Sequence, residues 1–323
     1  MTNRPDGGMD RTPSVDILLS TYNGAAYLRE LLESLKAQTY PGWTLIARDD
    51  GSGDDTAGIL RGFADARVRL IEDGKKRLGP SRSFGALLKY STAPYVMFCD
   101  QDDVWMRGKI ELTMKKMLEA ESRHAGAPVL VHTDMSVTDA GSKIIARSFW
   151  RYQRLDPKAV SLNGLLMQNV ATGCTIMMNG KLRELISVPD EASMHDWWAA
   201  LVASAFGRIE AVDEPTVFYR QHGKNAVGAV SYPFGYFAAR ITNIERSKVL
   251  LRGAIGQAEA FLAAYGDRLS EKDRLMVSDF ANLLRMGRLR RARTFLRHGF
   301  SSCGLLRKAG KFALLITTRA VKD

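Results

Sequence analysis

The stretch YVMFCDQDDVW, residues 95–105, places three carboxylates directly after an apolar run. Its first part, YVMFC (95–99), has the length and the composition of a buried strand. Asp100, Asp102 and Asp103 follow at once, in a chain whose formal net charge is +11. Carboxylates at close range repel one another unless something positive neutralises them. The stretch therefore predicts a buried strand that ends at a binding site.

Strand and helix patterns alternate on both sides of this stretch. Short apolar runs are followed by segments with apolar residues at helical spacing. In chain order, the expected strands and helices are 15–19, 25–38, 44–47, 56–64, 68–71, 81–91, 95–99 and about 107–121. This alternation predicts an α/β fold with a mostly parallel sheet that helices cover on both faces.

The second half of the chain has a less regular pattern. Buried strands are expected at 128–137 and 173–178, and a helix is expected at 195–206. Two further strands are expected at 209–213 and 216–220. We expect all of these elements to complete the same domain.

The chain divides into three parts by composition. Residues 1–14 are polar and contain Gly and Pro, which predicts a flexible N-terminus. Residues 15–230 hold the α/β pattern, and residues 231–323 show only helical patterns. The overall composition, 46% hydrophobic and 25% charged, is that of an ordinary globular protein.

The helical region at 231–323 ends in a strongly basic part. From residue 287 onward, ten Lys and Arg side chains are interleaved with apolar residues and accompanied by one acid, Asp323. Basic amphipathic helices are typical of segments that lie on an anionic membrane surface. The alternative is a helix hairpin that packs on the α/β domain and leaves its basic face in solvent. We expect membrane-surface attachment, because the charge has a single sign.

The cysteines and the apolar segments bear on the compartment. Cys99, Cys174 and Cys303 form no CxxC pair, which argues against a zinc site or a disulfide framework. The sequence shows no secretory signal and no uninterrupted apolar segment of bilayer-spanning length. We expect a cytoplasmic protein attached peripherally to the inner face of the membrane.

Three polar clusters each follow a predicted strand. They are STYN (20–23), RDD (48–50) and DQDD (100–103). In open α/β sheets ligands bind outside the carboxyl ends of the strands, so these clusters are expected to line one crevice. Mg²⁺ or Mn²⁺ would neutralise the acids there, and these cations keep substrate phosphates in their coordination shell. The implied substrate is anionic, and a diphosphate fits best.

The motifs resemble a known family. VDILLSTYNGAAYLRELLESLKAQTY (15–40), LIARDDGSGDDT (45–56) and YVMFCDQDDVW are similar to the nucleotide-binding half of family 2 glycosyltransferases, which have the GT-A fold. HDWW (195–198) and YRQHGKN (219–225) resemble acceptor-side motifs of the bacterial rhamnosyltransferase-like branch. The resemblance extends from about Val15 to about Asn225.

The resemblance implies a reaction and a division of the domain. It implies an inverting, metal-dependent transfer of rhamnose from dTDP-rhamnose to a hydroxyl of a bacterial surface polysaccharide or a lipid-linked oligosaccharide. Residues 15–127 would bind the nucleotide sugar, and residues 128–230 would bind the acceptor.

On the donor side, the resemblance assigns residues within all three clusters. The nucleotide-sugar site would comprise Ser20, Thr21, Tyr22, Asn23, Asp50, Arg82, Asp100, Gln101 and Asp103. Asp50 would accept from N3–H of uracil or thymine, while Asp49 holds its loop. Asp100 would face the ribose, Asp103 would contact the donor sugar or support Asp102, and Arg82 is either a base or diphosphate contact or a solvated helix arginine.

The metal ligands implied by the resemblance are Asp102 and His222, although a lone histidine is more often structural. Lys224 and Asn225 would belong to a loop that closes over the diphosphate. Gly173 and Cys174 would allow a close approach of the backbone near the acceptor.

On the acceptor side, Asp196 matches the family's catalytic carboxylate, the base that takes the acceptor proton. Its competing interpretation is an N-terminal helix cap. His195 replaces an acid of the usual motif and would orient the acceptor or pack. Trp197 and Trp198 would offer a sugar-stacking face, with one of the two in the core.

Other functions remain as alternatives. A UDP-hexose donor fits the same motifs. A sugar nucleotidyltransferase would show a Gly-rich, basic phosphate loop after the first strand, which STYNGAAYL lacks. A nucleic-acid binder would fit the pI near 9.6, but the basic residues collect in the C-terminal region, away from the acid clusters. An inactive relative is disfavoured because all the expected acids are present.

Overall fold

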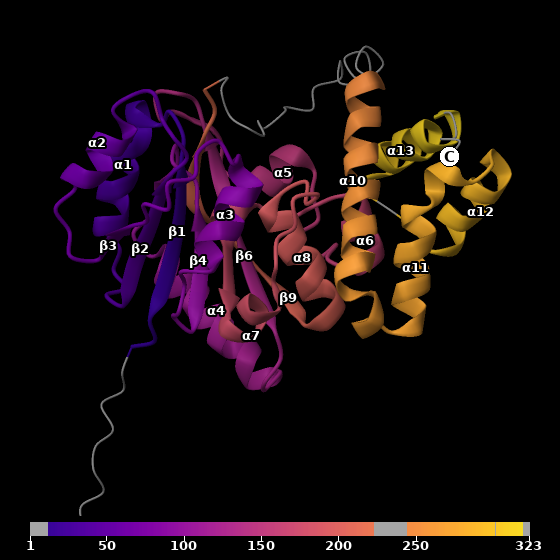
Figure 1. Ribbon diagram of the computed structural model, residues 1–323, viewed down its shortest axis with the longest axis horizontal. Coiled ribbons are helices and arrows are strands. Elements are labelled where there is room, and N and C mark those ends of the chain that lie inside the picture. The colour runs from indigo at the N-terminus through magenta and orange to yellow at the C-terminus, as the bar shows by residue number, and fades with distance from the viewer. Residues whose placement is uncertain (1–11, 223–243, 301, 319–323) are drawn as a thin grey trace, which may run out of the picture.

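A computed structural model describes residues 12–222, 244–300 and 302–318 of the chain (Figure 1). Its centre is one mixed sheet with strand order β3-β2-β1-β4-β8-β6-β9-β5, and β7 pairs with β6. The strands are β1 Val15–Thr21, β2 Trp43–Asp49, β3 Val68–Leu70, β4 Tyr95–Cys99, β5 Val104–Trp105, β6 Val129–Thr138, β7 Ile144–Ala146, β8 Ile176–Asn179 and β9 Arg208–Arg220.

Strands β1 to β4, all four of which the sequence predicts, form the parallel half of the sheet. β1 pairs in parallel with β2 and with β4, and β2 pairs in parallel with β3. Leu19 of β1 lies opposite Ala47 and Cys99, so the three strands end at the same edge. The polar clusters that follow these strands therefore meet there, as expected.

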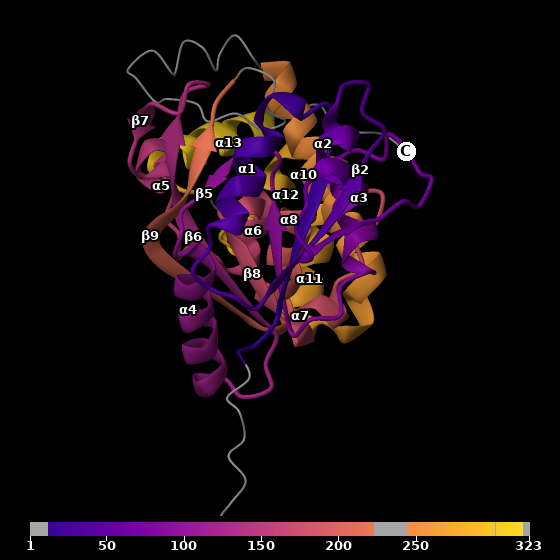
Figure 2. The same ribbon diagram turned by 90° about the vertical axis from the view of Figure 1, so that its left-hand side faces the viewer.

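Helices cover both faces of the sheet, as Figures 1 and 2 show. The alternation of buried residues along β1 explains the two layers, because Ile17 and Leu19 pack on one face and Leu18 on the other. The first face is covered by α1 Ala25–Lys36, α2 Thr56–Gly62 and α4 Lys109–Arg123; the second is covered by α3 Pro80–Leu88, α6 Leu162–Met167 and α8 His195–Phe206. The short α5 Phe149–Gln153 and α7 Gly180–Leu185 and the 3₁₀ turn η1 Gly173–Thr175 complete the domain.

The second half of the sheet is mixed rather than parallel. β8 runs antiparallel to both β4 and β6, and β5 runs antiparallel to β9. The segments 209–213 and 216–220, expected as two strands, form the single strand β9 beside β6. The β6–β9 register shifts between Thr133 and Ser136, where Asp134 lies opposite Pro215. Proline has no N–H to donate to the ladder, so the strand bulges there without ending.

The C-terminal helices share a core with the α/β domain. They are α10 Ile244–Tyr265, α11 Glu271–Ala281, α12 Arg288–Arg297 and α13 Leu305–Thr317, with 3₁₀ turns η2 Gly266–Arg268 and η3 Leu283–Arg285. The ring of Phe261 on α10 lies 5.5 Å from that of Trp198 on α8. Phe295, Phe300 and Leu315 are buried in the same cluster. These apolar side chains of the basic region therefore face the protein, as the packing alternative requires.

A buried arginine joins the C-terminal helices. Arg291 on α12 is completely buried and donates to the carbonyl oxygens of Leu283, Leu284, Met286, Leu315 and Thr318. These carbonyls lie in or directly after the last turns of η3 and α13, where a helix leaves most of its carbonyl oxygens without an N–H donor. The arginine thus satisfies acceptors at the ends of two separate elements, η3 and α13, at once. None of the described helices combines the length and apolar content that a membrane-spanning segment needs.

We expect Arg291→Met to lower the free energy of unfolding by about 3 kcal/mol, because it leaves several buried carbonyls without a donor. Urea denaturation measures the effect. The control is Arg293→Met, which changes an exposed arginine two positions away and should cost less than about 0.5 kcal/mol. Equal losses in the two variants would contradict the role assigned to Arg291.

Candidate functional site

The three polar clusters meet at the carboxyl edge of the parallel strands, and hydrogen bonds link them. The backbone N–H of Tyr22 donates to Gln101 Oε1 at 2.8 Å, and Gln101 Nε2 donates to the Tyr22 carbonyl at 3.0 Å. Asn23, in a left-handed conformation with φ of 49°, accepts from Gly53 N–H at 2.8 Å. Gln101 and Asn23 thus tie the loops together. Tyr22 is left 46% exposed, open to a ligand.

Asp49 holds its loop, as expected. Its carboxylate accepts from Ser52 N–H at 2.9 Å and from the hydroxyl of Thr21 at 2.9 Å. Thr21 is therefore buried and occupied within the loop, and it does not line the pocket as expected. The hydroxyl of Ser20 is half-buried and donates to that of Ser83 at 2.7 Å.

A buried ion pair organises the segment beside the second cluster. Arg48 is completely buried; its guanidinium lies 2.8 Å from Asp50 and 3.1 Å from Asp73. Asp50 also accepts from the N–H groups of Leu78 and Gly79 at 2.9 and 2.8 Å. Asp50 is only 4% exposed, and its hydrogen bonds fix the backbone of residues 78 and 79. The expected contact of Asp50 with the nucleotide base stays a prediction. Arg48 was not among the residues predicted to shape the site, although it belongs to the RDD cluster.

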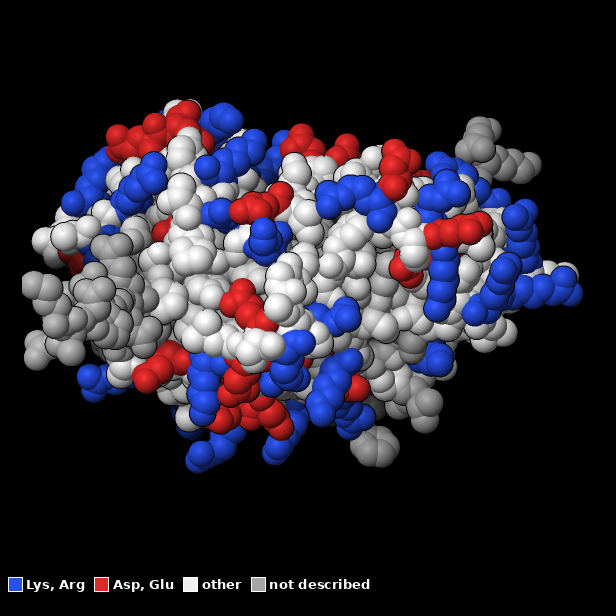
Figure 3. Space-filling model, turned by 90° about the horizontal axis from the view of Figure 1, so that it is seen from below, with Lys and Arg blue, Asp and Glu red and all other residues white. Residues whose placement is uncertain are grey.

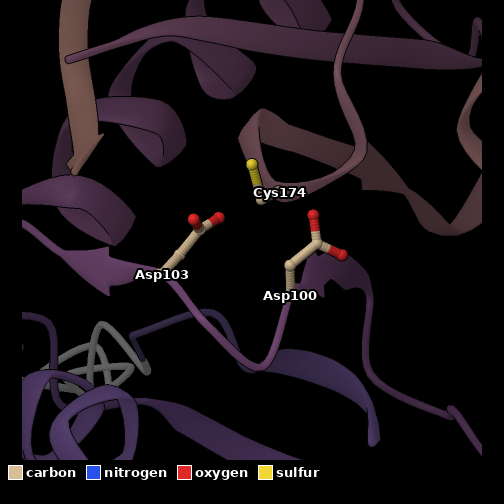
Figure 4. Close-up of side chains that lie close together, drawn as sticks. All are labelled: Asp100, Asp103 and Cys174. Carbon is tan, nitrogen blue, oxygen red and sulfur yellow. The ribbon is translucent and has the colours of Figure 1, made fainter. Parts of the chain in front are cut away.

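Asp100 and Asp103 point toward Cys174 from the turn after β4 (Figure 4). One ligand atom from each of the three lies within 4.8 Å of the other two. Asp103 is completely buried: one oxygen accepts from Arg220 N–H at 3.3 Å, and the other has no hydrogen-bond partner. Asp103 is thus placed to support the turn; the expected contact with the donor sugar or with Asp102 stays a prediction.

Burial and repulsion raise the pKa values of these acids. Desolvation, together with the charges of Asp102 and Asp196, raises the pKa of Asp100 to about 7. Desolvation raises the pKa of Asp103 well above its ordinary value, and the charge of Asp100 adds to this. The cluster therefore favours binding of a positive partner.

One such partner is a lysine that the sequence analysis did not single out. Lys109, in the first turn of α4, is completely buried and donates to the Thr216 hydroxyl at 3.2 Å. Its ammonium lies 4.7 Å from the centre of the Trp105 ring. Desolvation lowers the pKa of Lys109 to about 8, while the charges of Cys174 and Asp103 act in the opposite direction. In the sequence, the position of Lys109 beside the apolar residues Ile110, Met114 and Met117 of the predicted helix was the signal that its side chain would be buried.

The two expected metal ligands lie together, although 120 positions separate them. His222 Nε2 is 2.7 Å from Asp102 Oδ2, and both side chains are mostly buried. The imidazole stacks on Tyr27 of α1 with ring centres 4.7 Å apart. Arg220 lies over the same ring, donates to the Asp102 carbonyl at 3.0 Å and pairs with Glu30. The outward face of α1 thus positions the YRQH motif.

This donor set fits a hard divalent cation. The His222 imidazole and the Asp102 carboxylate lie within hydrogen-bonding distance of one another, and both are ligand types found at divalent-cation sites. The carboxylate oxygen of Asp103 that lacks a partner lies in the same turn. The thiol of Cys174 suits a softer metal, so the oxygen and imidazole donors are the better fit for Mg²⁺ or Mn²⁺. Lys224 and Asn225 lie outside the described residues.

Asp196 lies in the first turn of α8, next to η1. It is 8% exposed and accepts from Gly173 N–H at 2.9 Å and Trp197 N–H at 2.6 Å. Burial raises its pKa to about 6. A Cβ on Gly173 would lie 3.1 Å from His195 Nε2 and 3.5 Å from Asp196 Oδ2, so glycine permits this approach. The close approach expected at Gly173 is thus to Asp196.

His195 and Trp198 both take the packing role that was left open for them. His195 is 2% exposed and stacks on Phe84 with ring centres 3.9 Å apart, and burial lowers its pKa to about 3. Trp198 is completely buried against α10. Both point into the core, because α8 is apolar on nearly every face.

Trp197 and Arg82 lie outside the cluster of acids. Trp197 is half-buried, and its indole N–H donates to the Leu165 carbonyl at 2.6 Å. Arg82 forms an exposed ion pair with Asp190 at 3.5 Å. Roles for Trp197 toward the acceptor and for Arg82 toward the donor stay predictions.

Comparison with known proteins gives the family context. The sequence model of the family described as "Glycosyl transferase family 2" matches residues 16–186. The chain is 26% identical over 176 residues to the Escherichia coli protein named UDP-Glc:alpha-D-GlcNAc-diphosphoundecaprenol beta-1,3-glucosyltransferase WfgD, covering 54% of this chain and 64% of that relative. It is 23% identical to the dTDP-rhamnosyl transferase RfbG of Shigella flexneri, covering 65% of this chain and 74% of RfbG. For WfgD, therefore, the chain spans less than two thirds of the relative's length.

A solved structure has the same fold. It is the mannosyltransferase PcManGT from Pyrobaculum calidifontis in complex with GDP-Man and Mn²⁺, with a TM-score of 0.52 and 20% identity. The match covers 94% of this chain and 79% of that one. The expected α/β GT-A architecture with a helical C-terminal region is confirmed.

We expect Arg48→Met to lower the free energy of unfolding by about 3 to 5 kcal/mol, because it leaves the buried carboxylate of Asp50 and the partly buried one of Asp73 without their positive partner. The matched control is Arg61→Met, which removes an exposed ion pair with Glu72 and should cost less than about 1 kcal/mol. Chemical denaturation of both variants measures the difference. A cost for Arg48→Met no greater than that of the control would remove the ion pair as the organiser of this edge.

Proposed function

Because the chain belongs to glycosyl transferase family 2, we propose that it moves a sugar from a nucleotide-diphosphate donor to a hydroxyl acceptor, with inversion at the anomeric carbon. The observation that carries this proposal is the meeting of Asp102, His222, Asp100 and Asp196 at the carboxyl edge of the sheet. A sheet edge that brings together several acids and a buried, hydrogen-bonded carboxylate suits a diphosphate donor held by a cation and an acceptor deprotonated beside it.

For the donor we propose dTDP-rhamnose, with a UDP-hexose as the second candidate. RfbG is named a dTDP-rhamnosyl transferase, and its match covers more of this chain than the match to WfgD, which is named for UDP-Glc. Ser20 and the exposed Tyr22 would face the nucleotide at the ends of the linked loops.

For the acceptor we propose a bacterial surface polysaccharide or a lipid-linked oligosaccharide on the cytoplasmic side of the membrane. The name of WfgD includes a diphosphoundecaprenol acceptor, which belongs to the lipid-linked class. The protein would then work at the membrane surface, peripherally attached through its basic C-terminal region.

For the cofactor we propose Mg²⁺ or Mn²⁺ held by Asp102 and His222. PcManGT, which shares the fold, was solved with Mn²⁺. A cation bound there supplies charge compensation for the diphosphate leaving group. Tyr27 and Arg220 hold the imidazole and the turn in place for it.

Asp196 is the proposed base. The acceptor oxygen attacks the anomeric carbon as the bond from that carbon to the diphosphate oxygen breaks, and the acceptor's proton passes to the Asp196 carboxylate. The N–H groups of Gly173 and Trp197 fix the carboxylate. With a pKa of about 6, Asp196 is mostly ionised at neutral pH and is more basic than an exposed aspartate.

The family membership disfavours the two other candidate functions, a sugar nucleotidyltransferase and a nucleic-acid binder. A sugar nucleotidyltransferase would bind a triphosphate through a basic loop, whereas the loop after β1 holds Tyr22 and Asn23. For a nucleic-acid binder, the acids at the crevice would repel the phosphate backbone.

The donor proposal is tested by thermal shift and turnover with a panel of nucleotides. With Mn²⁺ present, we expect dTDP to raise the melting temperature and dTDP-rhamnose to be turned over faster than UDP-glucose. Asp102→Ala should abolish the Mn²⁺-dependent part of the shift, and His222→Ala should weaken it by about tenfold in Mn²⁺ affinity. Asp213→Asn, an exposed acid on β9, is the control. If neither dTDP nor UDP stabilises the protein with Mn²⁺, the donor site is misassigned.

The role of Asp196 is tested by Asp196→Asn and by a pH profile. The variant should keep Mn²⁺-dependent nucleotide binding and lose transfer by at least about a hundredfold. The base acts only when ionised, so at saturating donor and Mn²⁺ the wild-type rate should fall about tenfold per pH unit below pH 6 and level off above it. Transfer that persists in Asp196→Asn, or a rate independent of pH between about 5 and 8, would exclude Asp196 as the base.

A further inference from the structure

The outward face of α12 carries two strongly exposed leucines. Leu289 is 78% exposed and Leu296 is 67% exposed, the highest values among the exposed large apolar side chains of the described residues. The two are seven positions apart, close to two helical turns, so they lie along one stripe of the helix. Exposed apolar pairs of this kind mark contact surfaces more often than isolated surface leucines do.

The other face of α12 fixes the direction of this stripe. Arg291 and Phe295 are buried, and Arg291 donates to five backbone carbonyls of neighbouring elements. The residues that anchor the helix thus lie on the side opposite Leu289 and Leu296. The stripe cannot turn inward without breaking these bonds, so it is held in solvent by the fold.

Arginines flank the stripe. Arg293 lies between the two leucines along the helix, and Arg290 and Arg297 are exposed beside them. The helix itself, RLRRARTFLR, contains no acid. Figure 3 shows Lys and Arg side chains gathered at the end of the molecule that α11, α12 and α13 form.

We propose that the α12 stripe, formed by Leu289, Leu296, Arg290, Arg293 and Arg297, docks on an anionic lipid bilayer. The leucines enter the boundary between headgroups and acyl chains, and the arginines contact lipid phosphates. This deepens the membrane attachment given under the proposed function by assigning it to one face of one helix. The remaining apolar residues of the basic region that are buried, such as Phe300 and Leu315, pack inward and take no part.

Charge and shape favour a bilayer over the other occupants of such a surface. A second copy of the chain in a two-fold contact would place the same arginines against one another, which is repulsive. A nucleic acid would use the arginines but gain little from two leucines, since base stacking requires aromatic side chains. An anionic bilayer uses both kinds of residue, because interfacial binding combines buried apolar area with attraction to acidic lipids.

The test uses the full chain and vesicles of phosphatidylcholine with or without phosphatidylglycerol. We expect cosedimentation only with the anionic vesicles. Leu289→Gln with Leu296→Gln should lower the partition coefficient about tenfold, and replacing Arg290 and Arg293 by Gln should lower it roughly fivefold per arginine at low salt. The control is Leu275→Gln: Leu275 on α11 is 46% exposed, but Glu271 and Asp279 lie one turn away on either side, so its loss should have no effect.

Three outcomes would overturn the proposal. They are unchanged vesicle binding in the double leucine variant, equally tight binding of the wild type to a single-stranded oligonucleotide, and a leucine-dependent dimer in light scattering without vesicle binding. Mn²⁺-dependent nucleotide binding, measured in the same preparations, separates this test from that of the proposed function. Loss of vesicle binding with nucleotide binding intact concerns only the α12 stripe, and the reverse concerns only the donor site.

Discussion

The structure depends on how the negative charge of the aspartates that follow β4 is neutralised. The turn after β4 brings Asp100, Asp102 and Asp103 together in a place where Asp103 is fully buried. Such a turn is stable only when positive or donating groups surround it. The buried ammonium of Lys109 interacts electrostatically with Asp103, and Arg220 donates to Asp103 through its backbone N–H and to the Asp102 carbonyl through its guanidinium. These groups leave the outer side of the turn, with Asp102 and His222, for a ligand.

This requirement explains the irregular half of the sheet. Arg220 and His222 come from the end of β9, which reaches the turn because it pairs in parallel with β6 and antiparallel with β5. Because β4 and β6 both run antiparallel to β8, and β9 runs parallel to β6, β9 points in the same direction as β4 and ends at the edge where the acids lie. The bulge at Pro215 lets β9 continue as one strand, so that the motif YRQH arrives at the same edge as DQDD.

At the other end of the molecule, a buried positive charge is likewise stabilised by the polar groups around it. Arg291 is buried, and five carbonyl oxygens satisfy its guanidinium. It joins α12 to α13 and η3, and so the basic C-terminal region becomes part of the core around Trp198. Charge in this region therefore has two roles, one internal and structural and one exposed on the outward face of α12.

The sequence by itself determined the alternating elements, the meeting of three polar clusters at one edge and the identity of the acids there, because apolar periodicity and strand-end position are local properties. It did not determine which side chains point inward. His195 and Trp198 carry polar atoms, and the sequence left each with two possible roles, a contact with the acceptor or packing in the core; α8 buries both. Thr21, equally polar, is buried in its own loop, where its hydroxyl donates to Asp49. Only the tertiary structure decided these points, and only it brought Asp102 to His222 across 120 positions and buried Lys109, Arg48 and Arg291. The physical reason is that the burial and pairing of a charge depend on residues far away in the chain.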